Sequence, residues 1–303
     1  MQGNSITAAV TAIAALLVAT AGSAAEPAAK FDFNATVGAD YDSNVGIAEL
    51  DENAGAADSV ASFGAGIAAA FKAGEHVTLR LGWDYDASRH RQFSEFDLGL
   101  QHAVAGIDVT GHYVDAGLSA ERFGGRLDGE PYLTVTQYSP NVSKLIGDRV
   151  FLRGALIASR KRFDELPGRD AHAKAYRFDT YLLLDGMDRY VALAWQAGNE
   201  DAASRELDYR GRQGAVTYGY RLEHSRVLLK TQIRYEWRDY LNVTEALGAP
   251  RRDRRLRVLL TASVPVGGHC SFDARIERVQ NDSTFDPAAL DKYVGGLSLE
   301  AEF

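Results

Sequence analysis

The chain has 303 residues, of which 46% are hydrophobic and 24% charged, and its formal net charge is −8 at pH 7. This acidic balance argues against nucleic acid as a partner, because proteins that bind it present an excess of Lys and Arg to the phosphates. The single cysteine, Cys270, excludes an internal disulfide. Fourteen Tyr and 13 Phe are typical of a strand-rich protein.

The N-terminus has the pattern of a secretory signal peptide. An apolar run over residues 6–18 is followed by the small residues of 21–25. The run is too short to span a bilayer. We therefore expect residues 1–25 to be removed and residues 26–303 to form one domain. That domain contains no apolar stretch long enough for a transmembrane helix, but a barrel strand needs apolar residues only at alternate positions.

From residue 31 onward, apolar and polar residues alternate with the period of a β-strand. In the first such run, Phe31, Phe33 and Val37 share one side, and polar residues such as Asn34 and Thr36 share the other. The pattern predicts fourteen strands, at 31–44, 60–71, 77–86, 93–104, 107–118, 131–139, 149–161, 174–184, 190–198, 213–222, 227–238, 254–264, 270–279 and 290–303.

The predicted connections alternate in length. Short turns are expected at 73–76, 105–106, 146–148, 185–188, 223–225 and 265–268, and longer polar loops at 45–59, 119–130, 163–172, 199–212 and 239–253. A soluble sandwich or lipocalin-like barrel would turn its apolar rows inward, and fourteen strands of this kind do not easily share one compact core. The pattern predicts an all-β, transmembrane, antiparallel up-and-down β-barrel in the outer membrane of a Gram-negative bacterium, surrounded by lipid and with both termini periplasmic.

The last strand ends the chain on an aromatic residue. Its apolar side carries Tyr293, Leu297, Leu299 and Phe303. A C-terminal strand of this kind resembles the signal by which the barrel assembly machinery recognises outer-membrane barrels. Because neither edge of the sheet can stay open in lipid, we expect this strand to pair with residues 31–44.

If the apolar rows face lipid, the opposite rows face the lumen, and their charges are unevenly distributed. The predicted acidic wall consists of Asp32, Asp40, Asp42, Asp84, Asp86, Glu95, Asp97 and Asp108. The predicted basic wall consists of Lys230, Arg234, Arg238, Arg255, Arg257 and Arg275. Opposed walls would set up a transverse field in a water-filled channel. Alternatively, the same groups pair across the lumen and plug it.

The sequence predicts no enzymatic activity. A hydrolase of this shape would need a serine or a water activated by a histidine that an acid orients. His90, His112 and His172 lie near predicted loops or in the lumen, but no spacing links any of them to such a partner. Zinc-binding spacings and phosphate-binding glycine motifs are absent from the sequence, so we expect neither a metal nor a cofactor.

The string Tyr41-Asp42-Ser43-Asn44-Val45 ends the first strand, and residues 281–283 (Asn-Asp-Ser) precede the last one. With fourteen strands, this arrangement resembles the C-terminal barrel of the surface lipoprotein assembly modifier family. The resemblance covers nearly all of the mature chain but not the N-terminal helical-repeat domain of that family. It implies a translocation pore that exports a lipoprotein, with recruitment by a separate periplasmic partner.

Two other functions are compatible with the same sequence. The barrel could be a general diffusion porin for small polar solutes, or a structural or adhesive barrel that acts through its extracellular loops.

Overall fold

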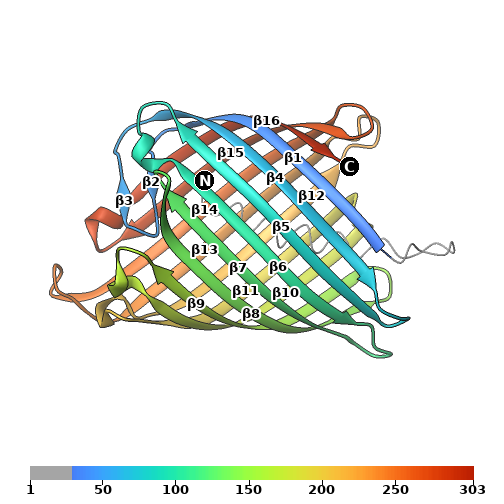
Figure 1. Ribbon diagram of the computed structural model, residues 1–303, viewed down its shortest axis with the longest axis horizontal. Coiled ribbons are helices and arrows are strands. Elements are labelled where there is room, and N and C mark those ends of the chain that lie inside the picture. Colours follow the sequence, from blue (N-terminus) through green and yellow to red (C-terminus); the bar gives the residue numbers. More distant parts are fainter. Residues whose placement is uncertain (1–28) are drawn as a thin grey trace.

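The computed structural model describes residues 29–303 as a closed barrel of fourteen antiparallel strands, each paired with its neighbours in chain order (Figure 1). The predicted fold and strand number are confirmed. The strands run obliquely to the long axis of the barrel, as closure of a sheet requires (Figure 1). The predicted signal peptide, residues 1–25, lies outside the described residues.

The barrel strands are longer than most of the predicted ones. They are β1 (Ala29–Asp42), β4 (Asp58–Lys72), β5 (Val77–His90), β6 (Leu98–Val109), β7 (Asp115–Leu127), β8 (Glu130–Ile146), β9 (Val150–Phe163), β10 (Ala171–Asp185), β11 (Arg189–Ala202), β12 (Tyr209–Arg221), β13 (Leu228–Thr244), β14 (Ala249–Pro265), β15 (Cys270–Ser283) and β16 (Leu290–Glu302). The strands β2 (Gly46–Ile47) and β3 (Glu52–Asn53) form a separate small hairpin. Four short 3-10 helices are η1 (Ser94–Phe96), η2 (Pro167–Arg169), η3 (Arg205–Leu207) and η4 (Asp286–Ala288).

The outer surface of the barrel is apolar, as the alternation predicts. Large side chains that are buried in soluble proteins are exposed here on every side, among them Phe33, Trp83, Phe178, Ile233 and Leu297. Such a continuous apolar surface is stable only against lipid or detergent. Among residues 29–303, no helix is long and apolar enough to cross a membrane.

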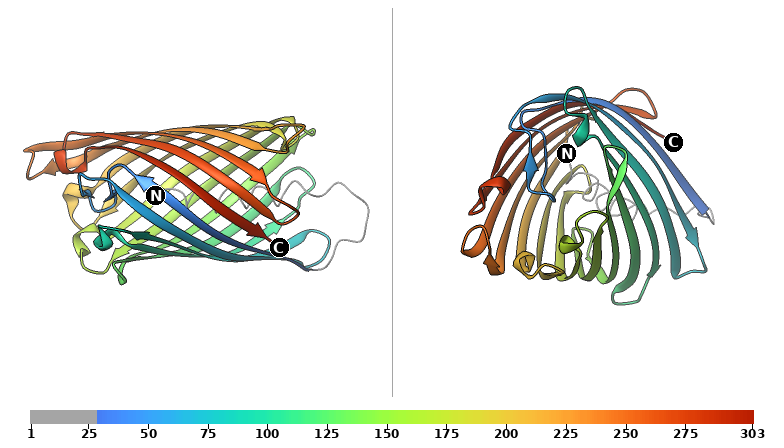
Figure 2. Two further views of the ribbon diagram at one scale, coloured as in Figure 1. Left: turned by 90° about the horizontal axis from the view of Figure 1, so that it is seen from above. Right: turned by 60° about the vertical axis from the view of Figure 1, so that its left-hand side comes forward.

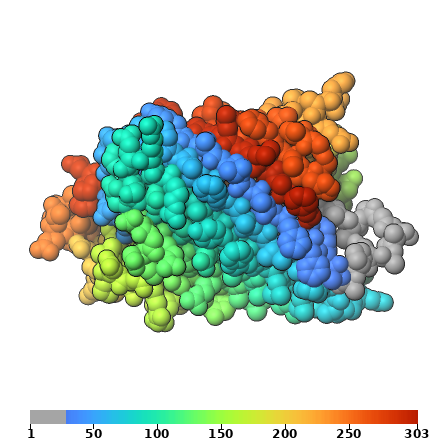
Figure 3. Space-filling view, turned by 45° about the horizontal axis from the view of Figure 1, so that its top comes forward, coloured from blue at the N-terminus to red at the C-terminus, as the bar shows by residue number. Residues whose placement is uncertain are grey.

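The barrel closes where β16 pairs with β1, and this predicted pairing is confirmed. The register matches Val37 with Leu299 and Ala39 with Leu297. Beyond the ladder, the backbone N–H of Phe33 donates to the carbonyl of Phe303 at 2.9 Å. The space-filling view shows this seam, with the first strand beside the last (Figure 3).

Two predicted connections in the first half are wrong. Residues 105–106 lie within β6, and the turn falls at 110–114 instead. The predicted long loop 119–130 is mostly strand, because β7 and β8 meet in a turn at Asp128 and Gly129, both with positive φ. An Asp-Gly pair at these angles forms a two-residue hairpin turn whose twist matches that of the strands.

Two of the other long loops are shorter than predicted. Residues 199–212 reduce to 203–208 and residues 239–253 to 245–248, since the flanking strands extend further. At 199–201 and 251–253 both strand faces are polar, so no alternation remains there, whereas Leu241 and Val243 continue the apolar outward row of β13. The two ends of the barrel still differ. One end, called here the turn end, holds Ala29, Phe303 and the turns 73–76, 110–114 and 147–149; the opposite loop end holds η1 to η4 and the β2–β3 hairpin (Figure 1).

Candidate functional site: a charged lumen with a folded-in hairpin

The predicted acidic residues separate into a lumenal group and a loop group. Strand alternation points six of them into the lumen: Asp32, Asp40 and Asp42 on β1, Asp84 and Asp86 on β5, and Asp108 on β6. Glu95 and Asp97 do not lie on a strand, because residues 93–97 form η1 and its flanks. The carboxylate of Asp97 accepts a hydrogen bond from the backbone N–H of His90 at 2.6 Å, so it closes a hairpin rather than lining the lumen.

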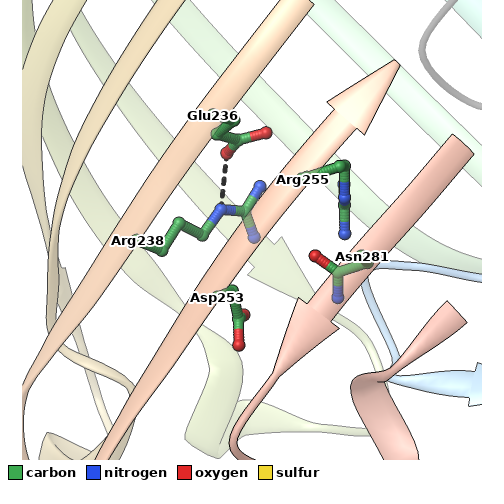
Figure 4. Close-up of a pocket in the computed structure, with 5 residues that line it drawn as sticks. All are labelled: Glu236, Arg238, Asp253, Arg255 and Asn281. Carbon is green, nitrogen blue, oxygen red and sulfur yellow. Dashed lines mark hydrogen bonds and ion pairs between the residues drawn. The ribbon is translucent and has the colours of Figure 1, made fainter. Parts of the chain in front are cut away.

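The predicted basic residues all face the lumen. Lys230, Arg234 and Arg238 lie on β13, Arg255 and Arg257 on β14, and Arg275 on β15. The register places Arg234 directly opposite Arg257, and Glu236 opposite Arg255. Figure 4 shows part of this wall, where Glu236 accepts a hydrogen bond from Arg238 at 2.6 Å beside Asp253, Arg255 and Asn281.

With every lumen-facing charge included, the barrel has two unlike walls. Strands β9 to β14 form what we call the basic wall, with Arg153, Lys161, Arg177, Arg221, Lys230, Arg234, Arg238, Arg251, Arg255 and Arg257 against Asp179, Glu200, Glu236 and Asp253. Strands β15, β16, β1 and β4 to β7 form the acidic wall, with Asp32, Asp40, Asp42, Asp58, Asp84, Asp86, Asp108, Asp115, Glu121, Asp273, Glu277, Glu300 and Glu302 against Lys30, Lys72, Arg80, His90, His102, Arg275 and Lys292. Because these are two consecutive runs of strands in one closed barrel, the walls face each other.

This division moves Arg275 from the predicted basic wall to the acidic one. Its guanidinium donates to Asp40 at 2.7 Å, across the single intervening strand β16. Gly296 of β16 lies beneath the pair, and a Cβ at this position would overlap the Asp40 carboxylate. The sequence could not show this proximity, because Asp40 and Arg275 are 235 residues apart and become neighbours only when the barrel closes.

The lumenal ion pairs run along the walls rather than across the lumen. Arg177 binds Asp179 of its own strand at 2.8 Å. Lys292 of β16 binds Asp42 of the neighbouring β1 at 2.7 Å, and Arg257 of β14 binds Glu277 of β15 at 2.9 Å. Each pair joins residues on one strand or on strands at most two apart. Pairing of this kind satisfies the wall charges without bridging the lumen.

Sequence reasoning missed a second cluster in the acidic wall. His102 of β6 lies between Asp84 and Glu121, each 3.5 Å from one ring nitrogen. Phe123 stacks on the imidazole with 4.2 Å between ring centroids. Had the strand been placed at 98–109, its alternation would have put His102 on the same face as Asp108. The predicted strand 93–104 contains His102, but its boundaries do not place His102 on one strand with Asp108.

The long connection between β1 and β4 folds into the mouth of the barrel. Residues 43–57, called here the mouth hairpin, contain β2 and β3 and lie within the outline of the opening when the loop end faces the viewer (Figure 2, right). Its base is fully buried, with Val45 and Ile47 each 1% exposed. Val45 shares a small cavity with lumen-facing Ser88, Leu98 and Lys292. The hairpin therefore narrows the lumen at the loop end.

The string Tyr41 to Val45 forms the base of this hairpin. Tyr41 points outward, whereas the Asp42 carboxylate accepts the backbone N–H of Asn44 at 3.0 Å. The Asn44 side chain accepts the N–H of Gly55 at 3.0 Å, and Ser43 Oγ accepts the N–H of Tyr293 at 2.8 Å. These bonds turn the chain inward at the end of β1.

The tip of the mouth hairpin is bound to the basic wall. Both carboxylate oxygens of Asp51 accept hydrogen bonds from Arg251 of β14, at 2.7 and 3.0 Å, and one accepts a further bond from Arg169 of η2 at 2.9 Å. Arg169 also donates to the carbonyl of Glu49 at 2.7 Å. The Arg251 guanidinium is fixed in turn by Asp253 and lies 4.8 Å from the ring centre of Tyr240.

The electrostatic surroundings of Asp51 favour its ionised form. Burial alone would raise the pKa of this carboxyl, but the hydrogen bonds and positive charges of Arg251 and Arg169 outweigh burial and hold the pKa below its ordinary value. The contact is therefore a charged clasp at neutral pH. Within residues 29–303, no group of three or more His, Cys, Asp or Glu side chains is arranged to hold a metal ion.

Comparisons with known proteins identify the fold. No protein-family model matches the chain, and no curated protein sequence matches it. Among solved structures, OmpT, an outer membrane protein of Vibrio cholerae, is similar with a TM-score of 0.56 and 8% identity, covering 93% of this chain and 100% of OmpT. For OccAB3 of Acinetobacter baumannii the TM-score is 0.46 and the identity 8%, and the match covers 90% of this chain and 99% of OccAB3. For the translocator domain of autotransporter NalP from Neisseria meningitidis the TM-score is 0.36 and the identity 13%, and the match covers 99% of this chain and 96% of that domain.

At these identities the likeness concerns the fold alone. The chain is a β-barrel of the outer-membrane type.

Proposed function

We propose that this barrel is a channel for small polar solutes, with its loop end outside the cell, both termini in the periplasm and the mouth hairpin as its constriction. The observation that carries the proposal is the position of the hairpin. Its base packs against the inner wall at Val45 and its tip binds Arg169 and Arg251. A loop held at both ends inside the opening limits the size of what can pass.

The pairing of the lumenal charges supports a water-filled interior. Ion pairs along the wall, such as Arg177 with Asp179, do not cross the lumen, and Arg257 pairs with Glu277 only where the basic wall adjoins the acidic wall. Charged groups lining an aqueous path tune which solutes pass. We propose a transport role without catalysis.

The proposal is tested by conductance in a planar bilayer. The refolded protein is expected to produce discrete conductance steps, and a variant in which residues 46–53 are replaced by a short Gly-Ser linker is expected to produce larger ones. The matched control shortens the turn at 245–248, which lies at the same end. If neither the full-length protein nor the hairpin variant conducts, the channel proposal is wrong.

Lipoprotein export remains the function implied by the resemblance to the assembly modifier family, and we retain it as a second proposal. The residues that carry the resemblance hold the base of the mouth hairpin through Asp42 and Asn44, so they help to position the hairpin in the opening. Export predicts that deletion of the gene removes a lipoprotein from the cell surface. Unchanged surface labelling of all lipoproteins would reject export and leave the solute channel standing.

A further inference from the structure

A basic patch lies on the outward face of the barrel at the loop end. It consists of Lys174 on β10, Arg210 and Arg212 on β12, and Arg252 and Arg254 on β14, and we call it the outer patch. Strand alternation turns all five side chains away from the lumen, and all are at least partly exposed. Because the chain as a whole has a formal net charge of −8, this group of cations is a local feature of one outward face.

The four arginines of the outer patch form two pairs. Arg210 and Arg212 are two residues apart on β12, and Arg252 and Arg254 are two apart on β14, so each pair spans about 7 Å. Only β13 lies between the pairs, which places them about 10 Å from each other. Asp239 of β13 lies between Arg210 and Arg252 in the register and accepts a hydrogen bond from Arg254 at 2.7 Å. One carboxylate thus serves four guanidinium groups.

The rest of the positive charge of these two pairs is not neutralised by the protein. Within residues 29–303, the side chains of the other three arginines form no ion pair. By contrast, Arg278 of the neighbouring β15 pairs with Asp291 at 3.0 Å, and Arg89 of β5 pairs with Asp97 at 3.5 Å. Neighbouring like charges repel each other unless an anion lies between them. The outer patch is therefore a site that an external anion would stabilise.

The outer patch borders the bilayer rather than open water. In the register, Trp237 of β13 lies between Arg212 and Arg254, and Ala197 of β11 lies between Arg212 and Tyr176. The rings of Trp237 and Tyr176 are exposed on the outward face. Trp and Tyr are enriched where a membrane meets water. Lipid headgroups therefore lie beside the patch, and a protein partner would have to displace them.

We propose that the outer patch binds a lipid whose headgroup carries two phosphate groups. A guanidinium fork donates two parallel hydrogen bonds to a phosphate, and the two arginines of a pair are close enough to share one phosphate. Two pairs about 10 Å apart then bind one phosphate each. Lys174 adds a fifth positive charge near Arg210, with Asn199 of β11 between them. The inference does not depend on conduction through the lumen, so it is tested separately from the channel proposal.

The test measures lipid binding to the refolded full chain in detergent by native mass spectrometry. The probe is lipid A, a glycolipid with two phosphates, and it is compared with its monophosphoryl form. Each arginine near an anionic lipid contributes about a factor of five to affinity, and one phosphate engages two arginines. Lipid A is therefore expected to bind about 25-fold more tightly than the monophosphoryl form. Equal dissociation constants, or no binding of either lipid, would overturn the inference.

A double variant locates the binding. Arg210→Gln with Arg212→Gln removes one arginine pair, so it should weaken the binding of lipid A about 25-fold and abolish the preference for two phosphates. The matched control, Arg89→Gln with Arg189→Gln, removes two exposed arginines, one on β5 and one at the turn end of β11, and should keep the preference. Heat-modifiable migration in gels gives the folded fraction of each variant. A patch variant that keeps the preference, or a control that loses it, would contradict the assignment to the outer patch.

Discussion

Replacing Asp51 with Asn should open the mouth hairpin. The carboxylate receives three hydrogen bonds from two arginines on separate parts of the barrel, and its side chain is 11% exposed. Asn keeps the size of the side chain and one acceptor oxygen but removes the charge. Arg251, with 5% of its side chain exposed, then keeps only Asp253 as a charged partner.

The size of the effect follows from burial. Removing one partner of a buried ion pair costs about 3–5 kcal/mol. Asp253 still neutralises Arg251, and Asn still accepts one bond, so we expect about 2 kcal/mol, which favours the open hairpin by roughly 30-fold. This shift acts on the position of the hairpin rather than on the barrel, because residues 43–57 contribute no strand to the closed sheet.

The measurement is single-channel conductance of the refolded protein at neutral pH. Asp51→Asn should give more frequent or longer-lived large conductance states than the unchanged protein. Glu52→Gln is the matched control, since Glu52 is the exposed neighbour on the same hairpin and should have no effect. If the Asp51 variant behaves like the control, the clasp does not hold the hairpin closed.

Three further predictions concern the clasp, the lumen wall and the seam. Because the pKa of Asp51 is lowered, its ionised carboxylate stabilises the closed hairpin above the ordinary carboxyl pKa, and this stabilisation is lost as pH falls through the lowered value. Conductance should therefore be constant from about pH 8 to pH 5 and rise only in stronger acid. A rise in conductance near pH 6 would point to another group. Gly296→Val should lower barrel stability by about 1–3 kcal/mol in urea unfolding, because a side chain there displaces an ion pair, while Gly295→Val, which meets nothing within 4 Å, should not. We expect Phe303→Asp to reduce membrane assembly far more than Glu302→Asp, measured by heat-modifiable migration in gels, and equal assembly of the two would contradict the proposed role of the apolar side of the last strand as an assembly signal.

Much of the fold could be predicted because a barrel strand is defined locally. Phe31, Phe33 and Val37 all face outward because successive residues of a strand point to opposite faces of the sheet. The pairing of the first and last strands follows from the cost of open sheet edges in lipid. The prediction failed where this local signal ends. The Asp128-Gly129 turn has its own sequence signature, but the polar residues around it resembled a loop.

The candidate site was predicted only in part. The lumenal facing of Asp84 or Arg234 follows from alternation, whereas the loop position of Asp97 depended on a strand boundary that the sequence left uncertain. The clustering of His102 with Asp84 and Glu121 joins three strands, so it needed their register as well as their facing.

The sequence by itself determined the class of architecture, the number of strands and the lumenal facing of residues such as Asp84 and Arg234. Only the tertiary structure decided which charges meet. Asp51 binds arginines 118 and 200 residues away, and Asp40 meets Arg275 across the seam. Alternation specifies the face of the sheet on which a side chain lies, but not which residues from distant parts of the sequence it contacts. Those neighbours are fixed when the sheet closes and a loop folds back into its opening.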